Sequence, residues 1–356
     1  MNILVISLAG IGDTLFATPF IHELRTNFPD ARIDALVLWP GAREILESNP
    51  HLNNIYQKDL MKDDKLECLR FLWQLRKNNY DVSFNTHPQS RIHYRVVARL
   101  INARLCVSHQ YENSTVLDKL LVSQTLPQDY SRHCIENNLA LLPFVGAKPV
   151  LDSHRYEIFL TPDELGWAEN FVASNKLANH RLLGIHVGSG QTKNLALRRW
   201  PLKSYRELLR RVTRDLPDVH VLLFGGPAEE KDHQLLVAEL DGTRILQPRT
   251  KNLRHTAALL KQCDCFVSVD TSLMHLAGAV NVPHQLVIET PTWNRTVEPY
   301  RDSFVLIRNP AVAGRNLELY RYDGGDIAGT AEQIVRCMES ISVDDVFRAV
   351  TEAFEA

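Results

Sequence analysis

The first part of the chain alternates short apolar runs with segments whose apolar residues recur at helical spacing. Ile3–Leu8 is a continuous, β-branched apolar run, which is typical of a parallel strand buried on both faces. After a Gly-rich turn, Leu15–Phe28 has the spacing of a helix, with Pro19 in its first turns and Pro29 just past its end. Arg32–Leu38 is predicted as a second strand, so the chain opens with a strand–helix–strand unit.

The same alternation continues and then starts again after residue 160. Further strands are predicted at Tyr80–Asn85, Ala103–Val107, Arg181–His186, His220–Phe224, Cys265–Val269 and His284–Ile288. Helices are predicted at Ile92–Ile101, Arg132–Leu142, Pro162–Asn175, Ser204–Asp215, Ala228–Leu240 and Asn252–Cys263, from Met274 onwards, and at Ser342–Phe354. Two successive series of this kind predict an α/β protein with two doubly wound, Rossmann-like domains.

Composition agrees with a two-domain globular protein. The chain has 356 residues, 45% of them hydrophobic and 23% charged, and its net charge of −2 offers no global field for binding nucleic acid. None of the six cysteines forms a convincing zinc motif, since Cys263 and Cys265 have no second pair, so we expect free, buried thiols in a reducing compartment. No apolar run is long enough to span a membrane, and the N-terminal run has no basic segment before it, which favours a cytoplasmic protein.

Four loops are the candidates for chemistry, because ligands of open α/β sheets bind beyond the carboxyl ends of the strands. All four are rich in Gly, Ser, Thr or acidic residues, and they are Ala9–Thr14, Gly188–Gln191, Gly225–Glu229 and Asp270–His275. Neither a full dinucleotide fingerprint nor a P-loop lysine is present in the first of them. An NAD-dependent oxidoreductase is therefore the least favoured enzyme class.

Asp13 is the distinctive residue of the first loop. At the start of a helix, an aspartate often only caps backbone amides, and this accounts for Asp13 about as well as a functional role does. The functional interpretation is a general base, because a carboxylate at a strand end can take the proton of an acceptor hydroxyl. Both interpretations remain open from the sequence.

The stretch from Ser268 to Ala279 is the most informative. A strand runs through Asp270, Thr271 and Ser272 directly into a helix whose first amides would bind phosphate. His275 lies one turn into that helix, where a structural and a functional role are equally plausible.

Two further loops would complete a site for a nucleoside diphosphate. Gly188 and Ser189 offer backbone amides and a hydroxyl, and the nearby Arg198 suits a diphosphate because its guanidinium is planar and permanently charged. Glu229 can accept hydrogen bonds from a ribose diol, or can only favour the first turn of its helix. With no acidic pair of the DxD type evident, helix amides and arginine would replace a metal ion, so we expect neither a metal nor a cofactor.

At these residues the chain resembles glycosyltransferase family 9, the ADP-heptose:lipopolysaccharide heptosyltransferases. The resemblance runs in order along nearly the whole chain, and its motifs are Gly12-Asp-Thr-Leu with Thr18-Pro, Arg198-Arg-Trp-Pro, Gly225-Gly-Pro-Ala-Glu and Ser268-Val-Asp-Thr-Ser-Leu-Met-His-Leu-Ala. It implies a GT-B architecture with an acceptor domain at 1–165, a donor domain at 166–341 and a terminal helix at 342–356 that packs back on the first domain.

The resemblance also implies an inverting, metal-independent transfer of heptose from an ADP-sugar to a saccharide of the lipopolysaccharide core or a related surface glycan. Asp13 would be the base. The residues implied to meet the donor are Gly188, Ser189, Arg198, Glu229, Asp270, Thr271, Ser272 and His275. The candidates on the acceptor side are Gly12, Thr14, His87 and Arg91. The partners would be the nucleotide sugar and a glycan or glycolipid, with peripheral contact at the inner membrane as a further hypothesis.

Two departures from the family pattern keep alternatives open. Ser272 stands where the family usually has glycine, and Glu289 adds a negative charge after the last clear strand. They motivate two alternatives: the same fold acting on another nucleotide sugar or on a protein acceptor, and a non-catalytic relative that only binds a nucleotide sugar.

Overall fold

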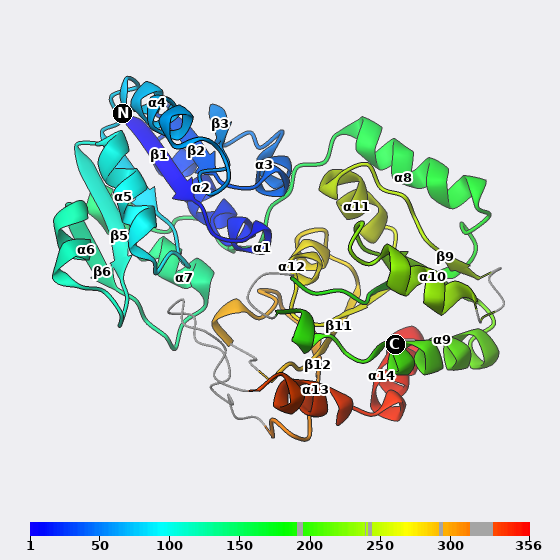
Figure 1. Cartoon of the computed structure of the whole chain (residues 1–356). Helices are drawn as coiled ribbons and strands as arrows, with labels where there is room; N and C mark the ends of the chain where they lie inside the picture. The colour runs from blue at the N-terminus through cyan, green and yellow to red at the C-terminus, as the bar shows by residue number, and fades with distance from the viewer. Residues whose placement is uncertain (191–194, 239, 241–243, 292–294, 314–329) are drawn as a thin grey trace. The chain divides into compact units, whose positions relative to one another are not determined.

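The computed structural model describes residues 1–190, 195–238, 240, 244–291, 295–313 and 330–356. The chain divides into two compact units. The first contains Met1–Phe159 with Arg295–Val297, and the second contains the rest of the described chain from Leu160 onwards. Figure 1 shows the elements of each unit, coloured along the chain. Within the described residues, each unit is built on one six-stranded parallel sheet, which confirms the predicted α/β class.

The first unit has the strand order β3-β2-β1-β4-β5-β6. Its strands are β1 (Asn2–Ser7), β2 (Arg32–Val37), β3 (Asn54–Gln57), β4 (Val82–Asn85), β5 (Leu105–Gln110) and β6 (Gln124–Pro127). Its helices are α1 (Ile11–Leu15), α2 (Thr18–Asn27), α3 (Pro40–Leu46), α4 (Lys65–Arg76), α5 (Ile92–Ile101), α6 (Val116–Leu121) and α7 (Cys134–Leu139), followed by a short 3₁₀ turn at Leu142–Val145. Helices α4, α5 and α6 pack beside one another, whereas α1 contacts α2 and α3, and α2 contacts α7.

The helix predicted at Leu15–Phe28 begins at Thr18 as α2, and the predicted turn before it contains the short helix α1. Pro19 has no N–H to donate to the carbonyl of Leu15, so the helix ladder is interrupted there. The hydroxyl of Thr18 donates to that carbonyl instead, at 2.8 Å. The break leaves α1 as a short helix directly after β1, and Asp13 lies on it.

The second unit has the order β12-β11-β10-β7-β8-β9, which is the same arrangement in chain order as that of the first unit. Its strands are β7 (Arg181–His186), β8 (Val219–Phe224), β9 (Ile245–Leu246), β10 (Cys265–Ser268), β11 (His284–Ile288) and β12 (Val305–Ile307). Its helices are α8 (Pro162–Ser174), α9 (Leu202–Asp215), α10 (Glu230–Ala238), α11 (Leu253–Leu260), α12 (Ser272–Ala279), α13 (Ala331–Glu339) and α14 (Val343–Glu355), with 3₁₀ turns at Leu195–Arg198 and Arg295–Val297, the latter grouped with the first unit.

Buried strands and amphipathic helices form the cores of both units. β1 and β7 are buried from their second residue to their last, as expected of central parallel strands covered on both faces. In α9, Tyr205, Leu208 and Val212 recur at helical spacing and are fully buried against this sheet. All six cysteines are free and buried, which confirms the expectation of small core residues. No helix of the described chain is long and apolar enough to cross a membrane.

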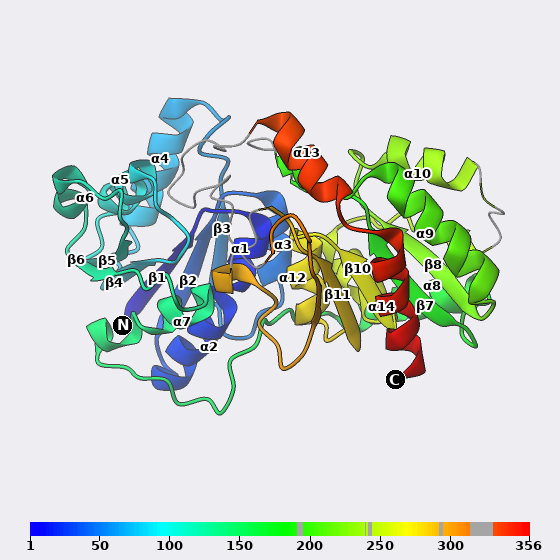
Figure 2. The ribbon, with the colours of Figure 1, turned by 90° about the horizontal axis from the view of Figure 1, so that it is seen from below.

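The terminal helix α14 packs on the core of the second unit, and its predicted return to the first domain remains a prediction. Val346, Val350 and Ala353 lie on one face of α14 and join the core formed by α9 and the sheet. The guanidinium of Arg181, at the start of β7, donates to the carbonyl of Phe354 at 2.7 Å and lies over its ring. In Figure 2, α14 lies alongside α9. The apolar face of α14 is thus fully used by its own unit.

Candidate functional site

The predicted donor residues converge at the carboxyl edge of the second sheet. Strands β7, β8 and β10 are neighbours in that sheet, and β7 is the strand from which the chain order runs in opposite directions. Ligands of doubly wound folds bind at this kind of switch point. The residues concerned are Gly188 and Ser189 after β7, Glu229 after β8, and Asp270, Thr271, Ser272 and His275 after β10. The last residue of the predicted loop Gly188–Gln191 lies outside the described residues.

Thr271 shapes the entry into α12. Its hydroxyl caps the helix by accepting from the amide of Met274 at 3.4 Å, and it lies 3.2 Å from Nδ1 of His186. Ser272 is the first residue of α12, so its backbone is right-handed helical and can carry a side chain without strain. The serine in place of the family's usual glycine is therefore compatible with the local fold.

Arg198, Asp270 and His275 form a charged cluster beside that helix start. Nη1 of Arg198 lies 3.3 Å from Oδ2 of Asp270, and Nε2 of His275 lies 4.0 Å from Oδ1 of the same carboxylate. The side chains of Arg198 and His275 are buried. A buried arginine needs a compensating anion, which Asp270 provides here. An incoming diphosphate would offer the same guanidinium a second anionic partner.

Glu229 approaches the Gly188 loop closely. Its Oε1 accepts from Nη2 of Arg199 at 2.9 Å, and its Oε2 accepts from the amide of Gly226 at 3.0 Å. A Cβ at Gly188 would lie 2.6 Å from Oε1 of Glu229, so only glycine fits at this position without a shift. The hydroxyl of Ser189 donates to the carbonyl of Leu195 at 2.8 Å, which ties this loop to the 3₁₀ turn carrying Arg198.

The histidines of this edge are uncharged at neutral pH. Burial lowers the pKa of His275 to about 4, against the opposing attraction of Asp270. Burial, together with the charges of His233 and Arg199, lowers the pKa of His186 to about 3. These rings can thus donate or accept hydrogen bonds but do not add positive charge. The positive charge at this edge comes from the two arginines.

His186 and Arg199 were not among the residues selected from the sequence. His186 is the last residue of β7, and its Nε2 is 2.7 Å from the Cβ position at Gly188. Arg199 also contacts Asp232 at 3.2 Å and thereby links two loops. Both residues lie next to a motif selected from the sequence, so the sequence pointed to this region. Which of two neighbouring side chains faces the carboxyl edge of the sheet depends on the fold.

Glu289 is compensated within its own unit. Its side chain is buried, its Oε2 accepts from the amide of Asn309 at 2.7 Å, and its Oε1 lies 3.7 Å from Nη1 of Arg308. The carboxylate thus connects the ends of β11 and β12. This structural role accounts for a charge that the sequence pattern left unexplained.

The first unit has its own switch point between β1 and β4, and Asp13 follows β1 there. Oδ2 of Asp13 accepts from the amide of Gly10 at 2.6 Å, so the carboxylate does stabilise the start of α1. The side chain is half-buried. A carboxylate oxygen that accepts one hydrogen bond retains a second lone pair, so the bond to Gly10 is compatible with a role as base.

Three of the four acceptor-side candidates are buried in the first unit. Gly12 and Thr14 lie inside α1, where the hydroxyl of Thr14 donates to the carbonyl of Gly10 at 3.3 Å. His87 is 1% exposed, with Tyr111 Oη 3.1 Å from its Nδ1 and Gln128 Nε2 3.1 Å from its Nε2. Thr14 and His87 are therefore buried within the first unit, and their predicted part in acceptor binding remains a prediction.

Arg91 differs from these three residues. It is the N-cap of α5, and its side chain is half-buried. The side chains of Arg91 and of the predicted base Asp13 are both half-buried, so neither is fully covered by the first unit.

Among the described residues, His22, His51 and Glu157 of the first unit form a group suited to hold a metal ion, and no residue of the predicted site belongs to this group.

Comparison with known proteins connects these features to one family. The family model described as glycosyltransferase family 9 (heptosyltransferase) matches residues 68–318. Lipopolysaccharide heptosyltransferase 3 of Escherichia coli is 26% identical over 289 residues, which cover 76% of this chain and 78% of the relative.

Two solved structures show the fold. The glycosyl transferase family 9 protein from Veillonella parvula DSM 2008 has a TM-score of 0.78 at 19% identity, with 100% of this chain and 97% of that chain covered. The Escherichia coli heptosyltransferase WaaC with ADP has a TM-score of 0.70 at 17% identity, with 100% and 98% covered. These likenesses establish the GT-B fold.

Proposed function

Because the chain belongs to glycosyltransferase family 9, the heptosyltransferases, we propose that it transfers a heptose from an ADP-sugar to a saccharide of the lipopolysaccharide core or a related surface glycan. The observation that carries this proposal is the convergence of Arg198, Asp270 and His275 at the start of α12. A helix N-terminus and a buried arginine together suit the diphosphate of a nucleotide sugar. A solved relative was described with ADP bound, which agrees with this choice of nucleotide.

The donor side would act by stabilising the leaving group. Breaking a sugar–diphosphate bond leaves negative charge on the departing ADP, and Arg198 with the first amides of α12 would balance it without a metal ion. Glu229 would hold the ribose, and Gly188 and Ser189 would approach the phosphates with backbone amides. Ser272, as the first residue of α12, would add its amide to the same set. Neutral His275 would donate a hydrogen bond to the phosphate or sugar side.

The acceptor side would activate the attacking hydroxyl. Asp13 would take its proton as the oxygen attacks the anomeric carbon, which inverts the configuration in a single displacement. Arg91 would help to bind the acceptor. Gly12, Thr14 and His87 would keep the loop carrying Asp13 and the turn after β4 in place.

The donor is the part of this proposal that a direct experiment decides. Thermal unfolding of the full chain is measured with ADP-heptose and with UDP-, GDP- and TDP-sugars, since a ligand of the folded state raises the melting temperature. We expect the largest rise with ADP-heptose. A rise with another nucleotide sugar and none with ADP-heptose would favour the alternative that Ser272 motivates, a different donor on the same fold.

Turnover separates an enzyme from a non-catalytic relative. With ADP-heptose and truncated lipopolysaccharide acceptors, we expect release of ADP together with a heptosylated product. Donor binding without product for any saccharide or protein acceptor would leave only the binding function.

The exposed face of α4 suits contact with an anionic membrane at the cytoplasmic face of the inner membrane. Leu66, Leu69 and Trp73 recur at helical spacing on that face, and Trp73 is 65% exposed. The exposed Arg70 and Arg76 lie on the same helix. A mixture of bulky apolar and basic side chains binds interfaces containing anionic lipids.

Vesicle sedimentation tests this contact. Trp73→Ser should reduce binding to vesicles that contain phosphatidylglycerol, and added salt should reduce it further. Val335→Ser is the matched control, because it removes an exposed apolar side chain from another helix, α13. Equal binding by the parent and the Trp73 variant would remove α4 from the membrane contact.

A further inference from the structure

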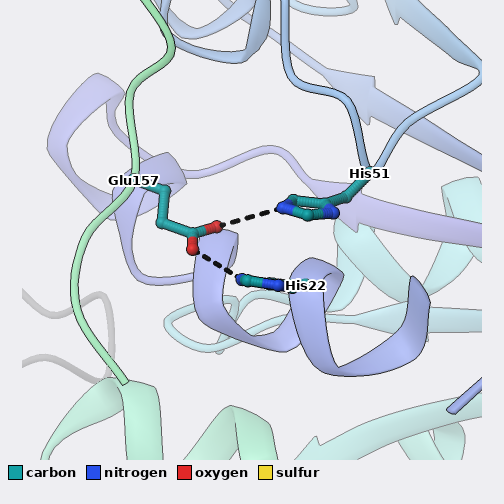
Figure 3. A group of neighbouring side chains, drawn as sticks. All are labelled: His22, His51 and Glu157. Atoms are coloured by element: carbon teal, nitrogen blue, oxygen red, sulfur yellow. Dashed lines mark hydrogen bonds and ion pairs between the residues drawn. The ribbon is translucent and has the colours of Figure 1, made fainter. Parts of the chain in front are cut away.

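Three potential metal ligands from distant parts of the sequence meet in the first unit, and none of them is among the residues assigned to heptose transfer. His22 lies on α2, His51 lies in the turn after α3, and Glu157 lies on the segment that leads out of the first unit. Figure 3 shows the Glu157 carboxylate directed at both imidazole rings. One ligand atom from each residue lies within 4.8 Å of the others.

The distances between these ligand atoms lie on either side of the ligand–ligand distance in a metal site. Nδ1 of His22 is 2.6 Å from Oε1 of Glu157, and Nε2 of His51 is 4.0 Å from Oε2. Tetrahedral zinc with bonds of about 2.0–2.1 Å holds its ligand atoms roughly 3.3 Å apart. Small rotations of the side chains would therefore bring all three to one ion.

One buried carboxylate oxygen of this cluster has no hydrogen-bond partner. Oε2 of Glu157 is buried and has no hydrogen-bond partner. The rings of His22 and His51 are stacked, with centroids 3.8 Å apart and an interplanar angle of 16°. The short His22–Glu157 contact accounts for one carboxylate oxygen, and the second oxygen faces Nε2 of His51 at 4.0 Å, beyond hydrogen-bond distance.

The carboxylate of Glu157 lies close to both imidazole rings, with one oxygen next to Nδ1 of His22 and the other facing Nε2 of His51. A divalent cation would bind the neutral imidazoles and compensate the carboxylate at the same time.

We propose that His22, His51 and Glu157 form a binding site for a divalent transition-metal ion, with zinc as the best match to two imidazoles and one carboxylate. Water would complete the coordination. The site is separate from the proposed metal-independent transfer reaction, and its failure would leave that proposal untouched.

The surrounding contacts indicate what the ion would do. Oε1 of Glu23, also on α2, accepts from the amide of Leu151 at 2.9 Å and lies 2.8 Å from Nε2 of His154. The segment before Glu157 is thus already tied to α2. A metal at His22 and His51 would extend this attachment to the last residues before the boundary at Phe159 and would stabilise the first unit.

Metal binding is measured first on the full chain, stripped with a chelator and dialysed against Zn²⁺ or Co²⁺. We expect about one ion per chain, and a visible Co²⁺ spectrum of nitrogen and oxygen ligands. His51→Ala and Glu157→Gln should weaken binding about 100-fold or more, because each removes a direct ligand. His180→Ala is the matched control, since it alters a pair of imidazole rings 4.1 Å apart in the second unit.

Three results would overturn the proposal. They are no bound metal in the parent, equal binding in parent and Glu157→Gln, and a sulfur-to-cobalt charge-transfer band, which would assign the ion to cysteine. Thermal unfolding provides a second readout: Zn²⁺ should raise the melting temperature of the parent and not that of Glu157→Gln. A parental circular dichroism spectrum and a parental urea midpoint of Glu157→Gln without metal show that the first unit, which contains Glu157, is folded, so loss of metal binding is then due to the lost ligand.

Discussion

The two units have the same strand order and differ in what they place at the switch point of the sheet. At the edge of the second unit, Arg198 pairs with Asp270, and Arg199 pairs with Glu229 and Asp232. At the edge of the first unit, His87 is buried between the Tyr111 hydroxyl and the Gln128 amide, while Asp13 is only half-buried.

In the function proposed above, this difference would separate binding from chemistry. A diphosphate carries several charges and needs many donors, which three adjacent loops of the second unit would supply. Proton removal needs a single carboxylate held in place, and Asp13 of the first unit would provide it from a short helix. One fold would then serve two tasks because the residues at the strand ends differ.

The largest expected effect is that of Asp13→Asn. Asparagine keeps an oxygen to accept from Gly10 but cannot take a proton, so turnover should fall about 10²- to 10⁴-fold. ADP affinity, a property of the second unit, should be unchanged by calorimetry. Asp30→Asn, an exposed residue past α2, is the control. Parental turnover in Asp13→Asn would show that its carboxylate only caps α1.

Arg198→Ala tests the binding half of the comparison. Removing the guanidinium leaves Asp270 as an unbalanced negative charge near the phosphates, so ADP affinity should fall about 10- to 100-fold. Titration calorimetry with ADP measures this directly. Arg214→Ala, which removes an exposed arginine paired with Asp215, should have no effect. Equal affinities for parent and Arg198→Ala would exclude the arginine from the donor site.

His87→Phe tests whether the first edge is structural. The Tyr111 hydroxyl and the Gln128 amide would each lose a buried partner, at a cost of about 1–3 kcal/mol in the free energy of unfolding. Urea denaturation measures the loss, and His93→Phe on the exposed face of α5 is the control. Parental stability with a raised KM for the acceptor would instead place His87 in contact with substrate.

Acidification should lower the free energy of unfolding, because the buried His275 resists protonation in the folded chain. Its pKa is about 4 in the folded chain and about 6.5 when unfolded, so the unfolded state binds more protons in between. This contribution to stability is complete above pH 6.5 and declines as the pH falls towards 4, by about 1 kcal/mol between pH 6.5 and 5.5. Urea denaturation at both values should show a smaller decline for His275→Gln. An identical decline would mean that His275 is accessible to protons in the folded state.

Sequence reasoning found the central strands and missed the peripheral ones. The run Arg181–His186 coincides with β7 and His284–Ile288 with β11, because a strand buried on both faces must be continuously apolar. The missed strands β3, β6, β9 and β12 are the edge strands, and β3 and β6 have few buried residues, so their patterns resemble loops. The helices α3 and α6 were also missed, because such short segments show too little helical spacing of apolar residues.

The sequence by itself determined the class of fold, the loops at the strand ends and the family, because each depends on short runs of neighbouring residues. Only the tertiary structure decided which side chains meet. It placed α14 on its own unit, enclosed His87, paired Arg199 with Glu229, and brought His22, His51 and Glu157 together. Such contacts join residues far apart in the chain, so they depend on how helices pack on the sheet, which the spacing of apolar residues in a single segment does not specify.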